Sequence, residues 1–221
     1  MTHLKEVRKL KLSRESLLLY AVTDRSWLNG KSLYDQVEES ILGGVTFLQL
    51  REKELNNDEF LKEAVEIKTL TDKHNIPFVI NDNIYVALQC NADGVHIGQT
   101  DMEAGQVRTL IGEDKIIGVS VQTVQQAIEA EKKGADYLGV GAMFSTSTKH
   151  DASLVTFEDL RNICNSVSIP VVAIGGINET NLSMLKGTNI DGAAIVSAIY
   201  SKKNIRKASQ ELHSILKQII K

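Results

Sequence analysis

The sequence predicts a single (β/α)8 barrel, the TIM-barrel fold of the α/β class, with a short N-terminal extension. Eight short apolar runs rich in Val, Ile and Leu recur along the 221 residues, as is typical of parallel strands buried on both faces. Segments with helical spacing separate these runs, so that strand and helix alternate throughout. Eight such units without a linker-like change of composition fit a closed barrel near the short end of its size range. An open, doubly wound parallel sheet is the alternative.

The elements follow one another at regular spacing. The expected strands span residues 17–24, 47–52, 77–82, 94–98, 115–121, 137–142, 170–176 and 192–198. Helical segments such as 32–44, 57–75, 123–135 and 156–167 lie between them, and many open with Ser, Thr, Asn or Asp, as a helix N-cap does. We therefore divide the chain into an N-terminal segment, 1–16, for which a helix is one option, and a catalytic barrel domain, 17–221.

The composition limits the partners and the compartment. Lys and Arg total 25 against 28 Asp and Glu, with both signs interspersed, so the basic surface that nucleic acid requires is missing. Cys90 and Cys164 fit no metal-binding pattern and are expected to be reduced core thiols. The N-terminus lacks the apolar region of a signal peptide, and no apolar run approaches a membrane span. We expect a cytoplasmic protein that binds neither nucleic acid nor membranes, and the oligomeric state is left open.

Polar residues collect where the expected strands end. Polar or glycine motifs follow seven of the eight strands, whereas the loops that lead into strands read as ordinary turns. Enzymes built on this barrel carry their active sites at the carboxyl ends of the strands. Asp93, Asp136 and Asp191 each precede a strand, so they lie at the opposite end and are interpreted as turn formers.

The motif QLREK ends the second strand. Gln49, Arg51 and Lys53 alternate with Leu50 and Glu52, so the period of a strand directs the first three toward one face, the barrel mouth. A guanidinium beside an ammonium suits several phosphate oxygens at once, and the Gln49 amide can bind the edge of a heterocycle. The alternative is a strand end that only forms salt bridges.

Two aspartates follow the next two strands. Asn81 and Asp82 end the third strand, and His96 and Asp101 lie at the end of the fourth. Adjacent strands bring the two carboxylates to the same rim, and carboxylates without His or Cys partners suit Mg²⁺, which takes its remaining ligands from water and substrate phosphates. Either aspartate could instead be a helix N-cap. His96 is either a hydrogen-bonded wall of the pocket or a proton donor.

The last two strands end in small residues. Gly175 and Gly176 follow the seventh strand and Ser197 the eighth, and in such barrels these loops often form a monophosphate site that glycine lets the backbone approach. A metal candidate beside Arg51 and Lys53 indicates a separate pyrophosphate site.

The long loop after the sixth strand, within residues 139–153, carries hydroxyls and one lysine. Loops of this length are often binding loops. Thr146 and Thr148 can donate hydrogen bonds to phosphate oxygens, while Lys149 can neutralise the charge that develops as a phosphate group leaves.

Seven motifs resemble those of the thiamine-phosphate synthases in order and spacing: QLREK, INDN, ADGVHIGQTD, IIGVSVQT, GADYLGVGAMFSTSTKHDA, VVAIGGI and AIVSAI. The resemblance covers roughly Leu18 to Ala198. It implies a transferase of thiamine biosynthesis that joins 4-amino-5-hydroxymethyl-2-methylpyrimidine diphosphate to 4-methyl-5-(2-phosphoethyl)thiazole. The products are thiamine phosphate and pyrophosphate, and the cofactor is Mg²⁺.

The resemblance also implies a role for each site residue. The pyrimidine is seated by Gln49 and Ser120; the diphosphate is held by Arg51, Lys53, Asn81 and Lys149; Mg²⁺ is bound by Asp82 and Asp101; the thiazole phosphate is surrounded by Thr146, Thr148, Gly176, Val196 and Ser197. The implied catalytic residues are Arg51, Lys53, Ser120 and Lys149. The implied mechanism is dissociative, with the diphosphate departing first. Many members of the family carry a basic residue in place of Asn83 and a proline in place of Ala142.

Other functions on the same barrel are the alternatives. The related thiazole tautomerase carries a proton-transfer histidine just after the fifth strand, where this chain has Gln122, whose amide does not titrate. A sugar-phosphate or indole-pathway isomerase would share the phosphate site of the last two strands but would not need both Asp82 and Asp101. A non-catalytic regulator is a third alternative, and it is disfavoured because it would not need the complete set of charged residues at the strand ends.

Overall fold

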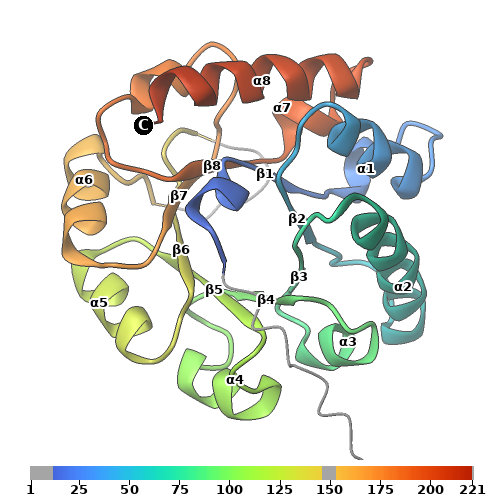
Figure 1. Cartoon of the computed structure of the whole chain (residues 1–221), viewed down its shortest axis with the longest axis horizontal. Coiled ribbons are helices and arrows are strands. Elements are labelled where there is room, and N and C mark those ends of the chain that lie inside the picture. The colour runs from blue at the N-terminus through green and yellow to red at the C-terminus, as the bar shows by residue number, and fades with distance from the viewer. Residues whose placement is uncertain (1–11, 146–152, 221) are drawn as a thin grey trace, which may run out of the picture.

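The computed structural model describes residues 12–145 and 153–220, whose strands close into one parallel barrel (Figure 1). Strands pair in chain order and the last pairs with the first, so the predicted closed barrel is confirmed and the open sheet is wrong. The strands of the described residues are β1 Leu19–Val22, β2 Phe47–Leu50, β3 Phe78–Asn81, β4 Gly94–Ile97, β5 Ile116–Val121, β6 Tyr137–Val140, β7 Val171–Ile174 and β8 Gly192–Ile195.

The helices form a ring outside the barrel (Figure 1). The α-helices of the described residues are α1 Leu33–Leu42, α2 Asn57–His74, α3 Ile84–Gln89, α4 Ala104–Ile111, α5 Val124–Lys132, α6 Phe157–Ser166, α7 Ser197–Tyr200 and α8 Ile205–Ile219, and the 3₁₀ turns are η1 Arg14–Leu17, η2 Arg25–Trp27 and η3 Leu182–Leu185. The expected N-caps are confirmed at Ser32, Thr123 and Thr156, whose side chains accept backbone hydrogen bonds. The cap of α2 is Asn56, one residue before the expected Asn57, which is the first residue of the helix.

The segment between β7 and β8 departs from the strict alternation of strand and α-helix. It contains only the short turn η3. Asn178 Oδ1 accepts a hydrogen bond from the backbone N–H of Thr180, and Asn181 Oδ1 accepts one from that of Asn178. Such local side-chain bonds compete with helix formation, while Leu182 and Leu185 still cover the strands as buried residues.

Two apolar layers stabilise the barrel. The larger lies between the strands and the helices, and the smaller fills the barrel interior, where the rings of Tyr20, Phe47 and Tyr137 meet. The fully buried Leu17 closes this interior from the amino-terminal end, where η1 lies across the centre of the ring (Figure 1). A Cβ on Gly192 would come within 1.8 Å of the Leu17 carbonyl oxygen, so only glycine lets η1 approach β8 so closely.

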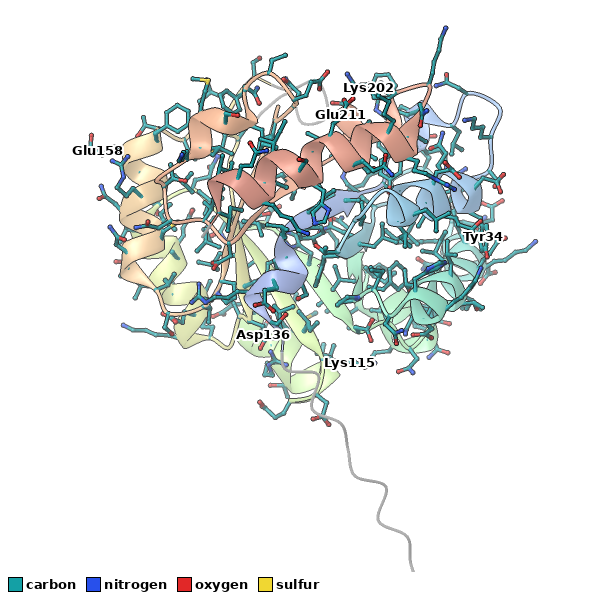
Figure 2. The ribbon with its side chains drawn as sticks, turned by 45° about the horizontal axis from the view of Figure 1, so that its top comes forward. Tyr34, Lys115, Asp136, Glu158, Lys202 and Glu211 are labelled. Carbon is teal, nitrogen blue, oxygen red and sulfur yellow. The ribbon has the colours of Figure 1, made fainter. Side chains whose placement is uncertain are left out.

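The three aspartates before strands link neighbouring strands as well as forming turns. Asp93, Asp136 and Asp191 each accept a hydrogen bond of 2.8 Å from a backbone N–H at the start of the preceding strand. Arg108 donates to Asp136 and Arg14 to Asp191. Figure 2 shows Asp136 at the end of the barrel where η1 lies. As predicted, these residues lie opposite the strand exits.

Both cysteines of the chain are free thiols, with Cys90 buried and Cys164 half-buried. Burial raises the pKa of the Cys164 thiol to about 12, so it stays protonated near neutral pH. Within the described ranges, the helices are too short or too polar to span a bilayer.

Candidate active site

The end of β2 is arranged as the alternation predicts. Gln49 is 3% exposed, and its Nε2 donates to the hydroxyl of Tyr20 inside the barrel. Arg51 is half-buried, its backbone N–H donates to Thr23 Oγ1 at 2.9 Å, and its guanidinium has no hydrogen-bond or ion-pair partner among the described residues. Lys53 Nζ lies 2.6 Å from Asp82 Oδ2. The structure therefore pairs Lys53 with Asp82 at these strand exits, and Arg51 lies two residues before Lys53 on the same strand end.

Glu52 of the same motif faces the opposite direction. Its side chain is 1% exposed, and its Oε2 lies 3.0 Å from Nε of Arg25. Nη2 of the same arginine lies 2.7 Å from Oε1 of Glu63 on α2. Burial raises the pKa of Glu52 to about 7; the Arg25 hydrogen bond opposes this rise, and the nearby Glu63 carboxyl adds to it. The QLREK motif indicated the charge of Glu52 but neither of its partners.

The ends of β3 and β4 carry the two candidate metal ligands. Asp82 adopts a left-handed backbone with φ 59°, an uncommon conformation for a residue other than glycine, in which it lies beside Lys53. Asp101 is exposed, and its Oδ2 accepts the Gly98 N–H at 2.7 Å. Among the described residues, no group of three or more His, Cys, Asp or Glu side chains could hold a metal ion by itself.

A shallow groove runs along these strand exits. Lys53, Asn81 and Asp82 line it together with Asn83 and Met102, which directly follows Asp101. The Asn83 side chain also caps α3, accepting the N–H of Val86 at 3.0 Å. Asparagine at this position therefore supplies the helix with an N-cap.

His96 is a buried, hydrogen-bonded residue on β4. It is 6% exposed, with its Nδ1 2.9 Å from Tyr137 Oη and its Nε2 2.9 Å from Ser120 Oγ. Burial raises the pKa of the Tyr20 and Tyr137 phenols, so both remain protonated at neutral pH. The sequence analysis missed these tyrosines, although a phenol within an otherwise aliphatic strand is a signal of a buried polar contact.

The end of β7 contacts the start of the β6 loop. Gly175 and Gly176 both have positive φ, at 97° and 66°. The N–H groups of Met143 and Phe144 donate to the carbonyls of Ile174 and Gly175 at 3.0 Å. A Cβ on Gly176 would come within 2.5–2.9 Å of the backbone of this loop, so glycine is needed for the loop as well as for any ligand.

The remaining predicted site residues divide into two groups. Val196 and Ser197 are half-buried and follow β8, at the start of α7. Thr146, Thr148 and Lys149 lie outside the described residues.

The Gln122 side chain donates hydrogen bonds to both ends of the β6 loop. Its Nε2 lies 3.1 Å from the Ser153 carbonyl oxygen and 3.3 Å from that of Gly141. The N–H of Val155 donates to the Ala142 carbonyl at 2.8 Å, which closes the base of the loop. Gln122 is therefore a structural clamp at the position where a tautomerase would carry its histidine.

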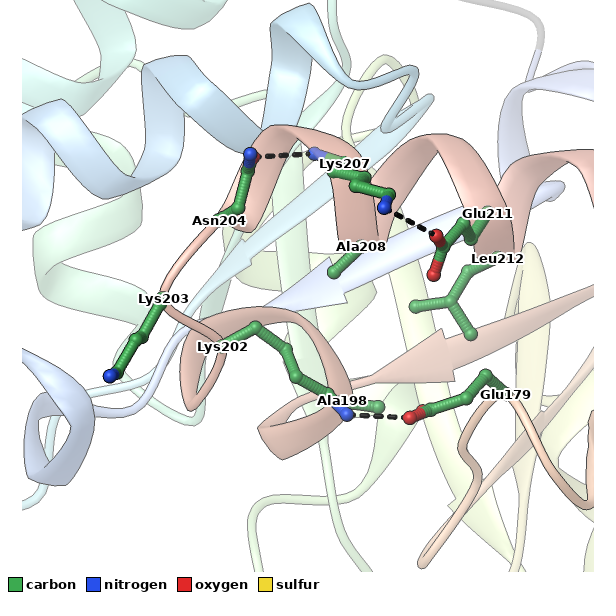
Figure 3. A pocket seen from close by; sticks show the side chains of 9 residues that line it. All are labelled: Glu179, Ala198, Lys202, Lys203, Asn204, Lys207, Ala208, Glu211 and Leu212. Carbon is green, nitrogen blue, oxygen red and sulfur yellow. Dashed lines mark hydrogen bonds and ion pairs between the residues drawn. The ribbon is translucent and has the colours of Figure 1, made fainter.

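A second hollow lies outside the mouth, between α7 and α8 (Figure 3). Lys202 lies 2.6 Å from Glu179, and Lys207 lies 3.8 Å from Glu211. Lys203 also lines the hollow, without an ion-pair partner among the described residues, but the hollow lies away from the strand exits that carry the predicted site residues.

Comparisons with known proteins identify the family. The family model described as thiamine monophosphate synthase matches residues 19–199. The chain is 54% identical to the thiamine-phosphate synthase of Clostridium tetani over 194 residues, which cover 88% of this chain and 93% of that protein. It is 52% identical to the thiamine-phosphate synthase of Ruminiclostridium cellulolyticum over 203 residues, 92% of this chain and 97% of that protein.

A solved structure gives the same result. The thiamine phosphate pyrophosphorylase of Pyrococcus furiosus superposes with a TM-score of 0.87 at 39% identity, covering 94% of this chain and 99% of that one. The predicted family resemblance is confirmed by sequence and by fold. The chain belongs to the thiamine-phosphate synthase family of enzymes.

Proposed function

We propose that the barrel mouth joins 4-amino-5-hydroxymethyl-2-methylpyrimidine diphosphate to 4-methyl-5-(2-phosphoethyl)thiazole, forming thiamine phosphate and pyrophosphate. The observation that carries this proposal is the cluster at the β2 and β3 exits. There Arg51 has no side-chain partner among the described residues, and Lys53 and Asp82 pair at 2.6 Å. Free or exchangeable cations at one rim suit the several anionic oxygens of a diphosphate.

Arg51, Lys53 and Asn81 are proposed to hold the diphosphate together with Lys149. Lys53 can exchange its contact with Asp82 for a phosphate oxygen, because their ion pair is partly exposed and therefore weak. Gln49 and Ser120 are proposed to bind the pyrimidine. Thr146, Thr148, Gly176, Val196 and Ser197 are proposed to surround the thiazole phosphate across the mouth.

Mg²⁺ is the proposed cofactor, and the donor set at the mouth fits it. Asp82 and Asp101 offer hard carboxylate oxygens at the exits of neighbouring strands. Two carboxylates match an ion that draws the rest of its shell from water and substrate phosphates. When bound, Mg²⁺ would neutralise charge on the diphosphate oxygens.

The proposed mechanism is dissociative. The bond between the pyrimidinylmethyl carbon and the diphosphate oxygen breaks first, and its electron pair leaves with the oxygen. The aminopyrimidine ring delocalises the resulting positive charge, and the lone pair of the thiazole nitrogen then forms the new C–N bond. Arg51, Lys53 and Lys149 stabilise the departing charge, so catalysis rests on positioning and electrostatics without a side-chain nucleophile.

The experiment measures thiamine phosphate and pyrophosphate formed by the purified chain from both substrates. We expect turnover that stops with a chelator and returns with Mg²⁺ or Mn²⁺. Arg51→Ala and Lys149→Ala should each lower kcat on the order of 10²-fold, as loss of a preorganised electrostatic contact does. The control is Arg161→Ala, whose exposed side chain donates to the Gly187 carbonyl oxygen. Absence of product from the unmodified chain, or full activity of Arg51→Ala, would contradict the proposal.

A further inference from the structure

A chain of hydrogen bonds crosses the inside of the barrel beneath its mouth. Gln49 Nε2 on β2 donates to Tyr20 Oη on β1 at 2.5 Å, and the hydroxyls of Tyr20 and Tyr137 lie 2.7 Å apart. Tyr137 on β6 lies 2.9 Å from His96 Nδ1, and His96 Nε2 lies 2.9 Å from Ser120 Oγ on β5. We name these five residues the interior relay. Its two ends are the proposed pyrimidine ligands, so the inference below rests on the proposed function.

The barrel interior is built to hold the relay. A Cβ on Gly118 would come within 2.3 Å of the Tyr137 hydroxyl and 2.5 Å of His96 Nδ1, so glycine on β5 makes room for this contact. Phe47 packs edge-on against Tyr20 and Tyr137, with ring centroids 4.6 and 5.6 Å apart. Since both tyrosines are almost fully buried, an unpaired hydroxyl here would be destabilising.

The number of protons sets the direction of each hydrogen bond in the relay. Because Gln49 donates to Tyr20, the Tyr20 hydroxyl keeps its own proton for Tyr137, which in turn donates to His96 Nδ1. A neutral imidazole that accepts at Nδ1 carries its proton on Nε2 and donates it to Ser120. In this arrangement every buried donor has an acceptor.

The two ends of the relay are left with opposite hydrogen-bonding roles toward a ligand: one can donate and the other can accept. The Ser120 hydroxyl accepts from His96, so its own proton is available to a ligand. The Gln49 amide uses its nitrogen toward Tyr20, so its carbonyl oxygen remains as an acceptor without a partner among the described residues. If the Gln49 amide were turned over, every bond would reverse and both ends would change polarity.

We propose that the interior relay sets Gln49 as a hydrogen-bond acceptor and Ser120 as a donor, and thereby selects an aminopyrimidine over the corresponding oxopyrimidine. An aminopyrimidine offers an exocyclic N–H to Gln49 and a ring-nitrogen lone pair to Ser120. The oxo analogue places a carbonyl oxygen opposite the Gln49 oxygen, so two acceptors face each other. Tyr20, Tyr137 and His96 are thus positioning residues that determine specificity without touching the substrate.

The direction of the relay can be measured in the free protein. Nitrogen-15 NMR of the imidazole rings distinguishes the two neutral tautomers, and the signal lost in His96→Gln assigns His96 among the five histidines of the chain. We expect a neutral ring with the proton on Nε2 and none on Nδ1. A ring protonated on Nδ1, or on both nitrogens, at neutral pH would overturn the proposal.

The consequence for specificity is measured with Tyr137→Phe. Without this hydroxyl, neither Tyr20 nor His96 is fixed in direction, so both ends of the relay can adopt either polarity. The ratio of kcat/KM for the pyrimidine diphosphate over its 4-oxo analogue should fall about 10-fold or more, the effect of losing one buried hydrogen bond. The KM for the thiazole phosphate should not change.

Tyr200→Phe is the matched control, since it removes a buried hydroxyl that contacts Ser40 at 3.3 Å, outside the relay. Unchanged selectivity in a folded Tyr137→Phe would overturn the inference and leave the proposed function intact. Failure of the unmodified chain to use the pyrimidine diphosphate would overturn the proposed function instead. If Tyr137→Phe does not fold, the tautomer of His96 in the unmodified chain decides.

Discussion

Glu52 differs in environment from the two cations beside it in the sequence. Arg51 and Lys53 belong to the mouth, whereas Glu52 is buried next to Arg25 and Glu63. Arg25 thus pairs with both carboxyls, and one oxygen of each, Oε1 of Glu52 and Oε2 of Glu63, is buried with no hydrogen-bond partner in the part of the chain that the structure describes. A single proton between these carboxyls would reduce their repulsion, which agrees with the raised pKa of Glu52.

The raised pKa of Glu52 predicts that the free energy of unfolding decreases as the pH rises. The pKa of Glu52 is about 7 in the folded chain, raised from 4.5, so the folded state binds more protons between these values. The stabilisation is present below pH 4.5 and is lost as pH rises through 7, by at most about 3 kcal/mol. Urea unfolding at pH 5 and pH 8 measures the loss.

Glu52→Gln should remove this part of the pH dependence, because the amide cannot ionise. The exposed Glu211→Gln is the control and should retain it. Equal pH dependence of Glu52→Gln and the unmodified chain would show that Glu52 titrates normally.

Asp82 allows charge to be separated from backbone conformation. Asparagine tolerates the left-handed backbone that Asp82 adopts, so Asp82→Asn should fold normally. Because the pair with Lys53 is partly exposed, stability should change by less than about 1 kcal/mol. Turnover should fall on the order of 10²-fold, with partial recovery in excess Mg²⁺. The control is Asp72→Asn, at an exposed position on α2, which should leave turnover unchanged. Full activity of Asp82→Asn in the presence of a chelator would show that Asp82 does not bind a catalytic metal ion.

At the scale of elements, the β6 loop depends on its neighbours for its position. Its first residues bond to the end of β7, and its two ends are joined by Gln122 at the end of β5. Three consecutive strand exits thus act as one unit around the mouth. Gln122 serves this unit through its amide N–H groups, and an amide cannot shuttle protons near neutral pH.

Gln122→Ala is therefore expected to loosen the loop base without removing a catalytic group. We expect the KM for the thiazole phosphate to rise and kcat to fall, each by about 10-fold, the range for losing hydrogen bonds that position a binding loop. Steady-state kinetics with each substrate varied measures both values. The exposed Gln125→Ala on α5 is the control. Rapid isomerisation of the carboxylated thiazole by the unmodified chain would show that the exclusion of tautomerase activity is wrong.

The elements themselves could be predicted from the sequence, because buried parallel strands and N-capped helices each leave a local pattern. The alternation in QLREK is consistent with the Gln49 side chain inside the barrel and with Lys53 at the strand exits. The partners of Glu52 could not be predicted, since Arg25 and Glu63 come from distant segments and no local spacing encodes them. The relay was missed for the same reason: Tyr20 and Tyr137 lie 117 positions apart in the chain, and only barrel closure brings them together.

At the scale of the whole molecule, the two ends of the barrel have different tasks. The amino-terminal end is closed by Leu17 and held by aspartates that bond to backbone N–H groups of neighbouring strands. The carboxyl-terminal end carries the guanidinium of Arg51, which has no partner within residues 12–145 and 153–220, and the partly exposed pair of Lys53 and Asp82. Stability and chemistry are thus separated along the barrel axis, as is general for this fold.

This separation predicts opposite effects for substitutions at the two ends. Asp191 is largely buried, accepting hydrogen bonds from Arg14 at 2.7 Å and from the Val171 N–H at 2.8 Å. Asp191→Ala leaves that N–H unpaired and should lower the free energy of unfolding by about 1–3 kcal/mol. Its kcat at 25 °C should match that of the unmodified chain, because the folded population still dominates at this temperature. Asp82→Asn should show the reverse, with normal unfolding and low kcat, and urea titrations paired with initial rates on both variants compare them directly. A large loss of kcat in folded Asp191→Ala would mean that the two ends of the barrel are coupled through the strands.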